Sequence, residues 1–212
     1  MTKFDGLIFD LDGTLWDSSA TVAEAWSAAL ARLGIKKTLS RDDLTREMGK
    51  PMDVIMADFF PDLTEEKRNA LMPELCDEET KLLTVKGGAL YPDVPETLSI
   101  LRERYRLFIV SNCQRGYIES FLAAHSFGNI FEGHLCWGDT GLTKGGTNRE
   151  LIRRYGLKSP IYIGDTEGDR LSAVEAEIPF LYAAYGFGEV TEECPRVGKF
   201  AELPSALDAL EA

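Results

Sequence analysis

Long apolar runs, cysteine pairs and histidines are all scarce in this sequence of 212 residues. No stretch approaches the ~18 consecutive apolar residues that indicate a membrane-spanning helix, and no basic segment with a cleavage site precedes the first apolar run. The formal net charge of −12 disfavours binding to nucleic acid or to an anionic membrane. We therefore predict a cytoplasmic globular protein, a monomer or homodimer, with no nucleic-acid or membrane partner.

The usual signatures of several enzyme classes are also missing. The four cysteines are far apart and form no CxxC pair, so neither a disulfide framework nor a zinc site is indicated. The sequence contains no GxSxG, HExxH, Walker A or GxGxxG motif. The two histidines, His125 and His134, lie outside the predicted strand ends, and we assign them structural or surface roles. A histidine base is therefore not expected.

Four near-continuous apolar runs are typical of strands that are covered on both faces. They span residues 6–11, 106–112, 160–165 and 178–186. Helix-like segments lie between these runs at 94–105, 114–124, 145–155 and 167–176. This alternation predicts an α/β fold with a parallel, doubly wound sheet.

Residues 16–84 interrupt that alternation. Their periodicity is helical in three stretches, and no convincing strand lies among them. We predict an all-helical inserted domain over 16–84, with a core domain formed by residues 1–15 and 85–212.

Three acidic residues stand at the carboxyl ends of two of the predicted strands, at the edge of the sheet where ligands bind. Asp10 and Asp12 end the first run, and Asp165 ends the third. Two carboxylates about 4 Å apart repel each other by about 4 kcal/mol at an effective dielectric near 20, so a hard cation such as Mg²⁺ would stabilise the cluster. Each residue alone could equally be a turn residue. An EF-hand is excluded, because Thr21 occupies the position that requires a glutamate.

A phosphate ligand would account for further polar residues. Ser111 and Asn112 end the second apolar run, just before a predicted helix start, where backbone N–H groups bind anions. Lys144 precedes another helix and could supply a positive charge. Asp169 could orient a metal-bound water, hold this lysine, or be an ordinary first-turn acid. For Ser111 and Lys144, ordinary turn and loop roles remain open.

Four ordered motifs in this sequence resemble those of the haloacid dehalogenase-like (HAD) hydrolases. They are "FDLDGTL", "IVSN", the lysine of "LTKGG", and "IGDTEGD". The resemblance is to the phosphoglycolate-phosphatase-like branch, which carries a helical (C1-type) cap after the first motif. It implies a Rossmann-like core and Mg²⁺-dependent phosphoryl transfer. One departure is "KGGTNRE", where many relatives have a proline-rich stretch after the lysine.

The resemblance also implies a role for each motif residue. Asp10 would be the nucleophile that forms an aspartyl-phosphate, and Asp12 the general acid and base. Mg²⁺ would be held by Asp10, the main-chain carbonyl of Asp12, and Asp165. The phosphoryl-binding residues would be Thr14, Ser111, Asn112 and Lys144.

The expected activity is that of a phosphatase acting on a small phosphorylated metabolite, phosphoglycolate-like or a sugar phosphate. Asp12 argues against a dehalogenase, because a halide leaves without a proton. A phosphomutase of the β-phosphoglucomutase type and a non-catalytic phosphate-binding module remain alternatives. In the cap, Arg46 and Lys50 are candidates for contacting the leaving group, although both could be ordinary surface cations.

Overall fold

A computed structural model describes residues 3–212 of the chain. Its centre is a six-stranded, wholly parallel sheet in the order β5-β4-β1-β6-β7-β8. The strands are β1 Gly6–Phe9, β4 Arg106–Ser111, β5 Gly133–Cys136, β6 Pro160–Gly164, β7 Phe180–Ala183 and β8 Arg196–Val197. Every residue of β1 and of β6 is buried, as their apolar composition predicts. The α/β prediction with a parallel, doubly wound sheet is confirmed.

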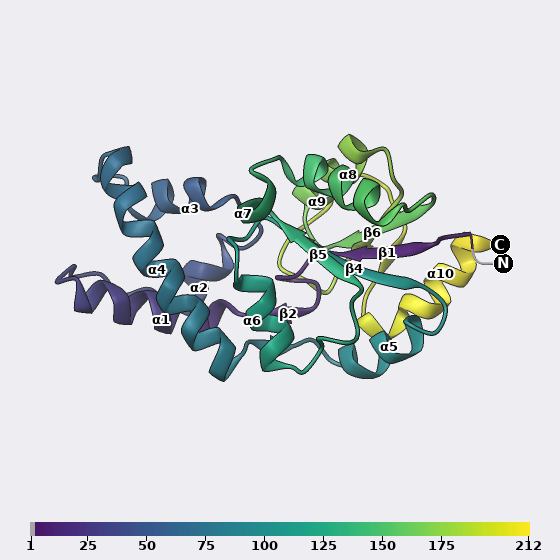
Figure 1. Ribbon diagram of the computed structural model, residues 1–212, viewed down its shortest axis with the longest axis horizontal. Coiled ribbons are helices and arrows are strands. Elements are labelled where there is room, and N and C mark those ends of the chain that lie inside the picture. The colour runs from purple at the N-terminus through teal and green to yellow at the C-terminus, as the bar shows by residue number, and fades with distance from the viewer. Residues whose placement is uncertain (1–2) are drawn as a thin grey trace.

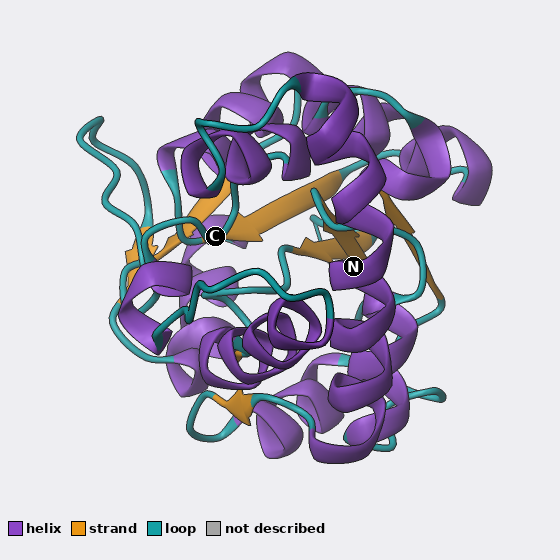
Figure 2. Ribbon diagram, turned by 90° about the vertical axis from the view of Figure 1, so that its left-hand side faces the viewer, coloured by secondary structure: helices purple, strands orange, loops and turns teal. Residues whose placement is uncertain are grey.

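Helices cover the two faces of this sheet. Figure 1 shows α8 and α9 on one side, and α5 and α10 on the other, while Figure 2 shows the strands lying between these layers. The core helices are α5 Val94–Leu101, α6 Tyr117–Ala124, α7 Trp137–Thr140, α8 Lys144–Tyr155, α9 Glu167–Ala176 and α10 Leu203–Glu211, with a 3₁₀ turn at Phe200–Glu202. The first and last described stretches of the chain meet at the end of the sheet farthest from the cap (Figure 1), where the Lys3 backbone N–H donates to Glu211.

A second group of helices, called the cap below, lies at the other end of the molecule (Figure 1). They are α1 Ser19–Arg32, α2 Arg41–Thr45, α3 Met52–Phe59 and α4 Glu65–Lys86. Helix α4 begins at the N-cap Thr64, whose side chain accepts a hydrogen bond from the Lys67 N–H, and it ends before Gly87, which has φ of 69°. Because α4 continues to Lys86, the predicted boundary at residue 84 falls within its last turn.

The structure corrects several predicted elements. It adds the sheet strands β5 and β8, and a two-stranded antiparallel sheet of β2 Trp16–Asp17 and β3 Ala89–Leu90, where the chain enters and leaves the cap. The statement that 16–84 contains no strand is therefore wrong at its first two residues. Helix α3 was also missed, and the helices predicted over 94–105 and 114–124 are shorter at one end.

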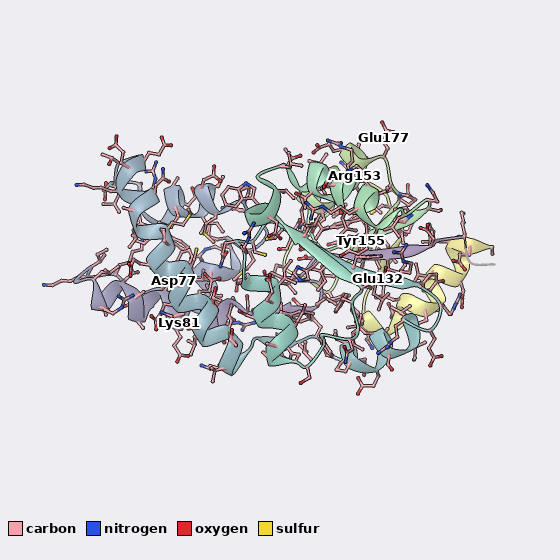
Figure 3. All side chains as sticks on the ribbon, viewed as in Figure 1. Asp77, Lys81, Glu132, Arg153, Tyr155 and Glu177 are labelled. Carbon is pink, nitrogen blue, oxygen red and sulfur yellow. The ribbon has the colours of Figure 1, made fainter. Side chains whose placement is uncertain are left out.

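The short edge strand β5 has no sequence pattern that predicts a strand, and its position in the sheet explains why. It pairs with β4, and its first two residues are only partly buried, so no continuous apolar run is needed. Tyr155 of α8 packs on this edge, with its ring centroid 4.8 Å from that of Phe108, and Figure 3 places it beside β4 and β5 near Glu132.

No helix among residues 3–212 combines the length and apolar character needed to cross a membrane.

Candidate active site

The carboxyl ends of three neighbouring strands bring the predicted site residues together. Strand β1 pairs with both β4 and β6, so the residues that follow or end these strands share one edge of the sheet. Asp10 follows β1, Ser111 ends β4 and Asp165 follows β6. The Asp10 backbone N–H donates to the carbonyl of Ile163 at 2.8 Å, which fixes Asp10 against β6.

Asp10 and Asp165 form a buried cluster of carboxylates with a third acid, Asp169. One carboxylate oxygen from each of Asp10, Asp165 and Asp169 lies within 4.8 Å of the others. Asp10 Oδ2 is buried and has no hydrogen-bond partner in the structure. Burial, reinforced by the Asp169 charge, raises the Asp10 pKa well above its usual value and raises the Asp165 pKa to about 7. An unpaired oxygen in a crowd of carboxylates fits a hard cation such as Mg²⁺.

Lys144 supplies one positive charge to this cluster. Its Nζ donates to Asp10 Oδ1 at 2.7 Å and to Asp169 Oδ1 at 2.5 Å. Burial alone would lower the Lys144 pKa, but the charges of Asp10 and Asp169 outweigh burial and raise it. One ammonium against three carboxylates leaves an excess of negative charge when all are ionised, and a divalent ion would offset it.

Asp169 acts both as a helix cap and as a partner of the lysine. In the capping box at the start of α9, the Thr166 side chain accepts from the Asp169 N–H, and Asp169 Oδ2 accepts from the Thr166 N–H at 3.0 Å. Asp169 Oδ2 also accepts from the Asp165 N–H at 3.1 Å. Two of the alternatives for Asp169, first-turn acid and lysine holder, are therefore both present.

Two glycine-containing turns enclose the Asp165 carboxylate. A Cβ at Gly13, which has φ of +85°, or at Gly186 would overlap Asp165. Asp165 Oδ2 accepts from the Phe187 N–H at 2.8 Å, and Asp165 Oδ1 accepts from the Thr14 hydroxyl at 3.2 Å. The hydroxyl of Thr14, a predicted phosphate ligand, is thus engaged with an acid of the cluster.

The Asp12 carboxylate lies apart from the cluster. Asp12 Oδ1 accepts from the Ser18 hydroxyl at 2.6 Å and from the Tyr117 hydroxyl at 2.9 Å. Burial raises the Asp12 pKa to about 6, and these two hydrogen bonds counteract part of the rise. A carboxyl group with this pKa can both donate and accept a proton near neutral pH.

A cavity lies between this edge of the sheet and the cap, and it contains about 510 Å³ of empty space, part of which is open solvent. The predicted residues among its lining are Asp10, Asp12, Lys50, Ser111 and Asn112. The Asn112 amide donates to the Gly49 carbonyl at 3.0 Å, which links the core to the segment between α2 and α3.

The two cap cations are placed differently. Lys50 lines the cavity, but its ammonium is held by Glu47 at 2.7 Å and by Asp58 at 2.9 Å. Arg46 pairs with Asp43, is 68% exposed at its side chain and is not part of the cavity wall. The structure therefore does not bring Arg46 into the site.

The histidines lie outside this cavity. His125 packs in an edge-on arrangement against the Trp16 ring at 5.7 Å, and His134 is part of β5. Neither residue is among the cavity-lining residues.

Four residues at the site were missed by the sequence analysis: Ser18, Tyr117, Glu79 and Gln114. A signal for Glu79 exists. In α4 the buried residues recur every four positions as Leu71, Leu75, Glu79 and Leu83, so the glutamate occupies a core position within a leucine stripe. Burial raises the Glu79 pKa to about 8. No comparable pattern marks Ser18, Tyr117 or Gln114.

A family model of haloacid dehalogenase-like hydrolases matches residues 7–183. The chain belongs to this family. Curated relatives of this hydrolase include the phosphoglycolate phosphatase of Aliivibrio fischeri, which is 26% identical over 85% of this chain and 84% of the relative. The phosphoglycolate phosphatase of Rhodobacter capsulatus is 28% identical over 96% of this chain and 95% of the relative. The family and these relatives identify the chain as an enzyme, a phosphoric monoester hydrolase of the phosphoglycolate-phosphatase-like branch.

Solved structures share the fold. A haloacid dehalogenase-like family hydrolase from Streptococcus pneumoniae matches with a TM-score of 0.81 and 23% identity, over 97% of this chain and 99% of that one. CbbY from Rhodobacter sphaeroides, solved with xylulose-(1,5)bisphosphate, matches with a TM-score of 0.79 and 17% identity. This match covers 96% of this chain and 99% of CbbY. At these identities the likeness concerns the fold alone.

Proposed function

We propose that this hydrolase is a Mg²⁺-dependent phosphatase that releases phosphate from a small phosphorylated metabolite through an aspartyl-phosphate. The observation that carries the proposal is the Asp10 carboxylate. One of its oxygens is paired with Lys144, while the other is buried without a partner at the floor of the cavity. Such a carboxylate is held in place for attack on a phosphorus atom and has an oxygen available for a cation.

In the first step, an Asp10 oxygen attacks phosphorus, and the bond between phosphorus and the leaving oxygen breaks. Asp12 gives its proton to that oxygen, so the dephosphorylated leaving group departs as an alcohol rather than as an alkoxide. In the second step, Asp12 takes a proton from water, which attacks the phosphorus of the aspartyl-phosphate. Inorganic phosphate leaves and the Asp10 carboxylate is restored. The Asp12 pKa of about 6 suits both tasks.

Asp10, the main-chain carbonyl of Asp12, and Asp165 would hold the magnesium ion. When bound, the ion would neutralise the negative charges that otherwise keep the carboxylate and the phosphoryl group apart. The hydrogen bonds that Phe187 and Thr14 donate to Asp165 fix the orientation of this carboxylate.

The remaining motif residues would bind the transferring phosphoryl oxygens. Lys144 lies 2.7 Å from Asp10 Oδ1 and is the nearest side-chain cation. Ser111 and Asn112 line the cavity beside Asp10. Thr14 would contribute indirectly through Asp165, because its hydroxyl already donates there.

The relatives support hydrolysis over phosphoryl transfer to a second hydroxyl, because the first eight curated matches are all named phosphoglycolate phosphatase. Phosphoglycolate-like compounds and sugar phosphates are both candidate substrates. The cytoplasmic location and a monomeric or dimeric state remain predictions.

Phosphate release from p-nitrophenyl phosphate, with and without Mg²⁺, tests this proposal. We expect Mg²⁺-dependent release that falls to background in the Asp10→Asn variant. Activity retained in that variant would remove Asp10 as the nucleophile. Hexose 1-phosphates, assayed in parallel, would reveal a phosphomutase if isomerisation outran phosphate release.

A further inference from the structure

The cap side of the cavity is predominantly apolar. Six of its lining side chains carry no charge and little or no polar surface: Val22, Trp26, Leu44, Met48, Met52 and Ile55. A leaving group beneath the cap would therefore lie against hydrocarbon and an indole ring. Such a surface favours a leaving group with apolar faces and provides no counter-charge.

The charged residues of the cavity wall are unfavourable for an anionic leaving group. Besides the catalytic aspartates, the wall contains Glu47, the buried Glu79, whose raised pKa of about 8 favours its neutral form, and the cation Lys50. Lys50 is already held between two carboxylates, Glu47 at 2.7 Å and Asp58 at 2.9 Å. A substrate carboxylate would enter this space without a free positive partner, which is costly in a buried site.

Two polar groups are nevertheless aligned for hydrogen bonding inside this cavity. Glu79 is 3% exposed, and its Oε2 accepts from the Trp26 indole N–H at 2.7 Å. Gln114 lines the same cavity from the core side and lies near enough to Glu79 to counteract part of the rise in the pKa of that carboxyl, although neither its amide nitrogen nor its amide oxygen, both buried, makes a hydrogen bond of good geometry. Buried amide groups without partners are rare, and a ligand hydroxyl would satisfy them.

We propose that the cap side of this cavity selects a neutral, hydroxyl-bearing leaving group, which hydrogen-bonds to Glu79 and Gln114, over a carboxylate-bearing one such as glycolate. The preferred substrates are then phosphomonoesters of polyols or sugars. This inference rests on the proposed phosphatase function and concerns the same site. It separates this chain in substrate preference from the relatives named phosphoglycolate phosphatase.

Matched pairs of substrates test the inference directly. One pair is 2-hydroxyethyl phosphate and 2-phosphoglycolate, and another is glycerol 3-phosphate and 3-phosphoglycerate. Within each pair, a hydroxymethyl group replaces a carboxylate at the same chain length. We expect kcat/KM to be at least about tenfold higher for the neutral member, because a site built around hydrogen bonds rejects a group that leaves a buried charge unpaired.

Variants connect the preference to the two named side chains. Glu79→Leu continues the leucine stripe of α4, so it preserves the helix packing while removing the carboxyl group. We expect this variant, and Gln114→Ala, to lower kcat/KM for glycerol 3-phosphate relative to p-nitrophenyl phosphate by about tenfold. The matched control is Asp77→Asn, on the exposed face of the same helix (Figure 3), which should leave this ratio unchanged.

The outcomes separate this inference from the phosphatase proposal. If p-nitrophenyl phosphate is hydrolysed but the carboxylate-bearing member of each pair is equal or better, the inference is overturned and the phosphatase stands. Phosphoethanolamine, a cationic analogue of 2-hydroxyethyl phosphate, would overturn it in the same way if it proved the best two-carbon substrate. If no phosphate ester is hydrolysed, both proposals fail together.

Discussion

Tyr117 donates a hydrogen bond to Asp12 Oδ1 at 2.9 Å, and so joins helix α6 of the core to the proposed general acid. The same oxygen accepts from Ser18, which lies just before the first cap helix. The acid is therefore oriented from both sides of the junction between core and cap.

Loss of the Tyr117 hydroxyl should matter most when the leaving group needs a proton. We expect Tyr117→Phe to reduce kcat about tenfold for an alkyl phosphate but less than about twofold for p-nitrophenyl phosphate, whose leaving group departs unprotonated. Steady-state kinetics with both substrates would show the difference. Tyr105→Phe, which removes a hydroxyl bonded to Glu211 near the chain ends, is the control. Equal losses on both substrates would assign Tyr117 a general structural role.

Removal of the Lys144 charge should destabilise the fold. In Lys144→Met, the buried Asp10 and Asp169 carboxylates lose their shared cation, and we expect a loss of about 3–5 kcal/mol in the free energy of unfolding at neutral pH. The Asp10 pKa is already raised, so protonation at lower pH should recover part of this loss. Urea unfolding at several pH values would measure it, with exposed Lys158→Met as the control. A loss independent of pH would contradict this explanation.

Glu79 should make stability depend on pH. Its pKa rises from 4.5 to about 8 on burial, so the folded state retains a proton that the unfolded state loses. Stability from this group is fully present below about pH 4.5 and is lost as pH rises to about 8. Relative to wild type, Glu79→Gln should gain several kcal/mol across this window, at about 1.36 kcal/mol per pKa unit. Chemical denaturation at pH 5 and pH 9 tests this, and parallel pH profiles for wild type and Glu79→Gln would refute it.

A side chain at Gly186 should disrupt the proposed metal site. Its Cβ would overlap the Asp165 carboxylate and displace it. We expect Mg²⁺ to raise the melting temperature of the wild type but not of Gly186→Ala, because a ligand that binds only the folded state stabilises it. Gly128→Ala, which meets no atom within 4 Å, is the control. An undiminished Mg²⁺ shift in Gly186→Ala would show that Asp165 does not hold the ion.

The sequence predicted the central part of this structure because its signals are local and redundant. Buried parallel strands such as β1 and β6 require continuous apolar runs, and the acids at their ends follow directly in the chain. The parallel pairing of β1 with β6 then brings Asp10 and Asp165 together without further information. The same logic fails for β5, a half-buried edge strand with no apolar run.

Partnerships between distant residues could not be predicted in this way. Ser18 and Tyr117 meet at Asp12 although 99 positions separate them, and nothing in either local sequence marks the contact. Glu79 was detectable in principle, since it replaces an apolar residue in the α4 stripe. Its hydrogen bond to Trp26 depends on how α4 packs against α1, which only the folded chain defines.

The most direct test of the central claim is mass analysis of the enzyme, quenched in acid during a single turnover with Mg²⁺ and p-nitrophenyl phosphate. The account predicts a phosphoryl group on the peptide that contains Asp10, lost in Asp10→Asn. A phosphoryl group on any other residue, or phosphate release by Asp10→Asn at the wild-type rate, would contradict it.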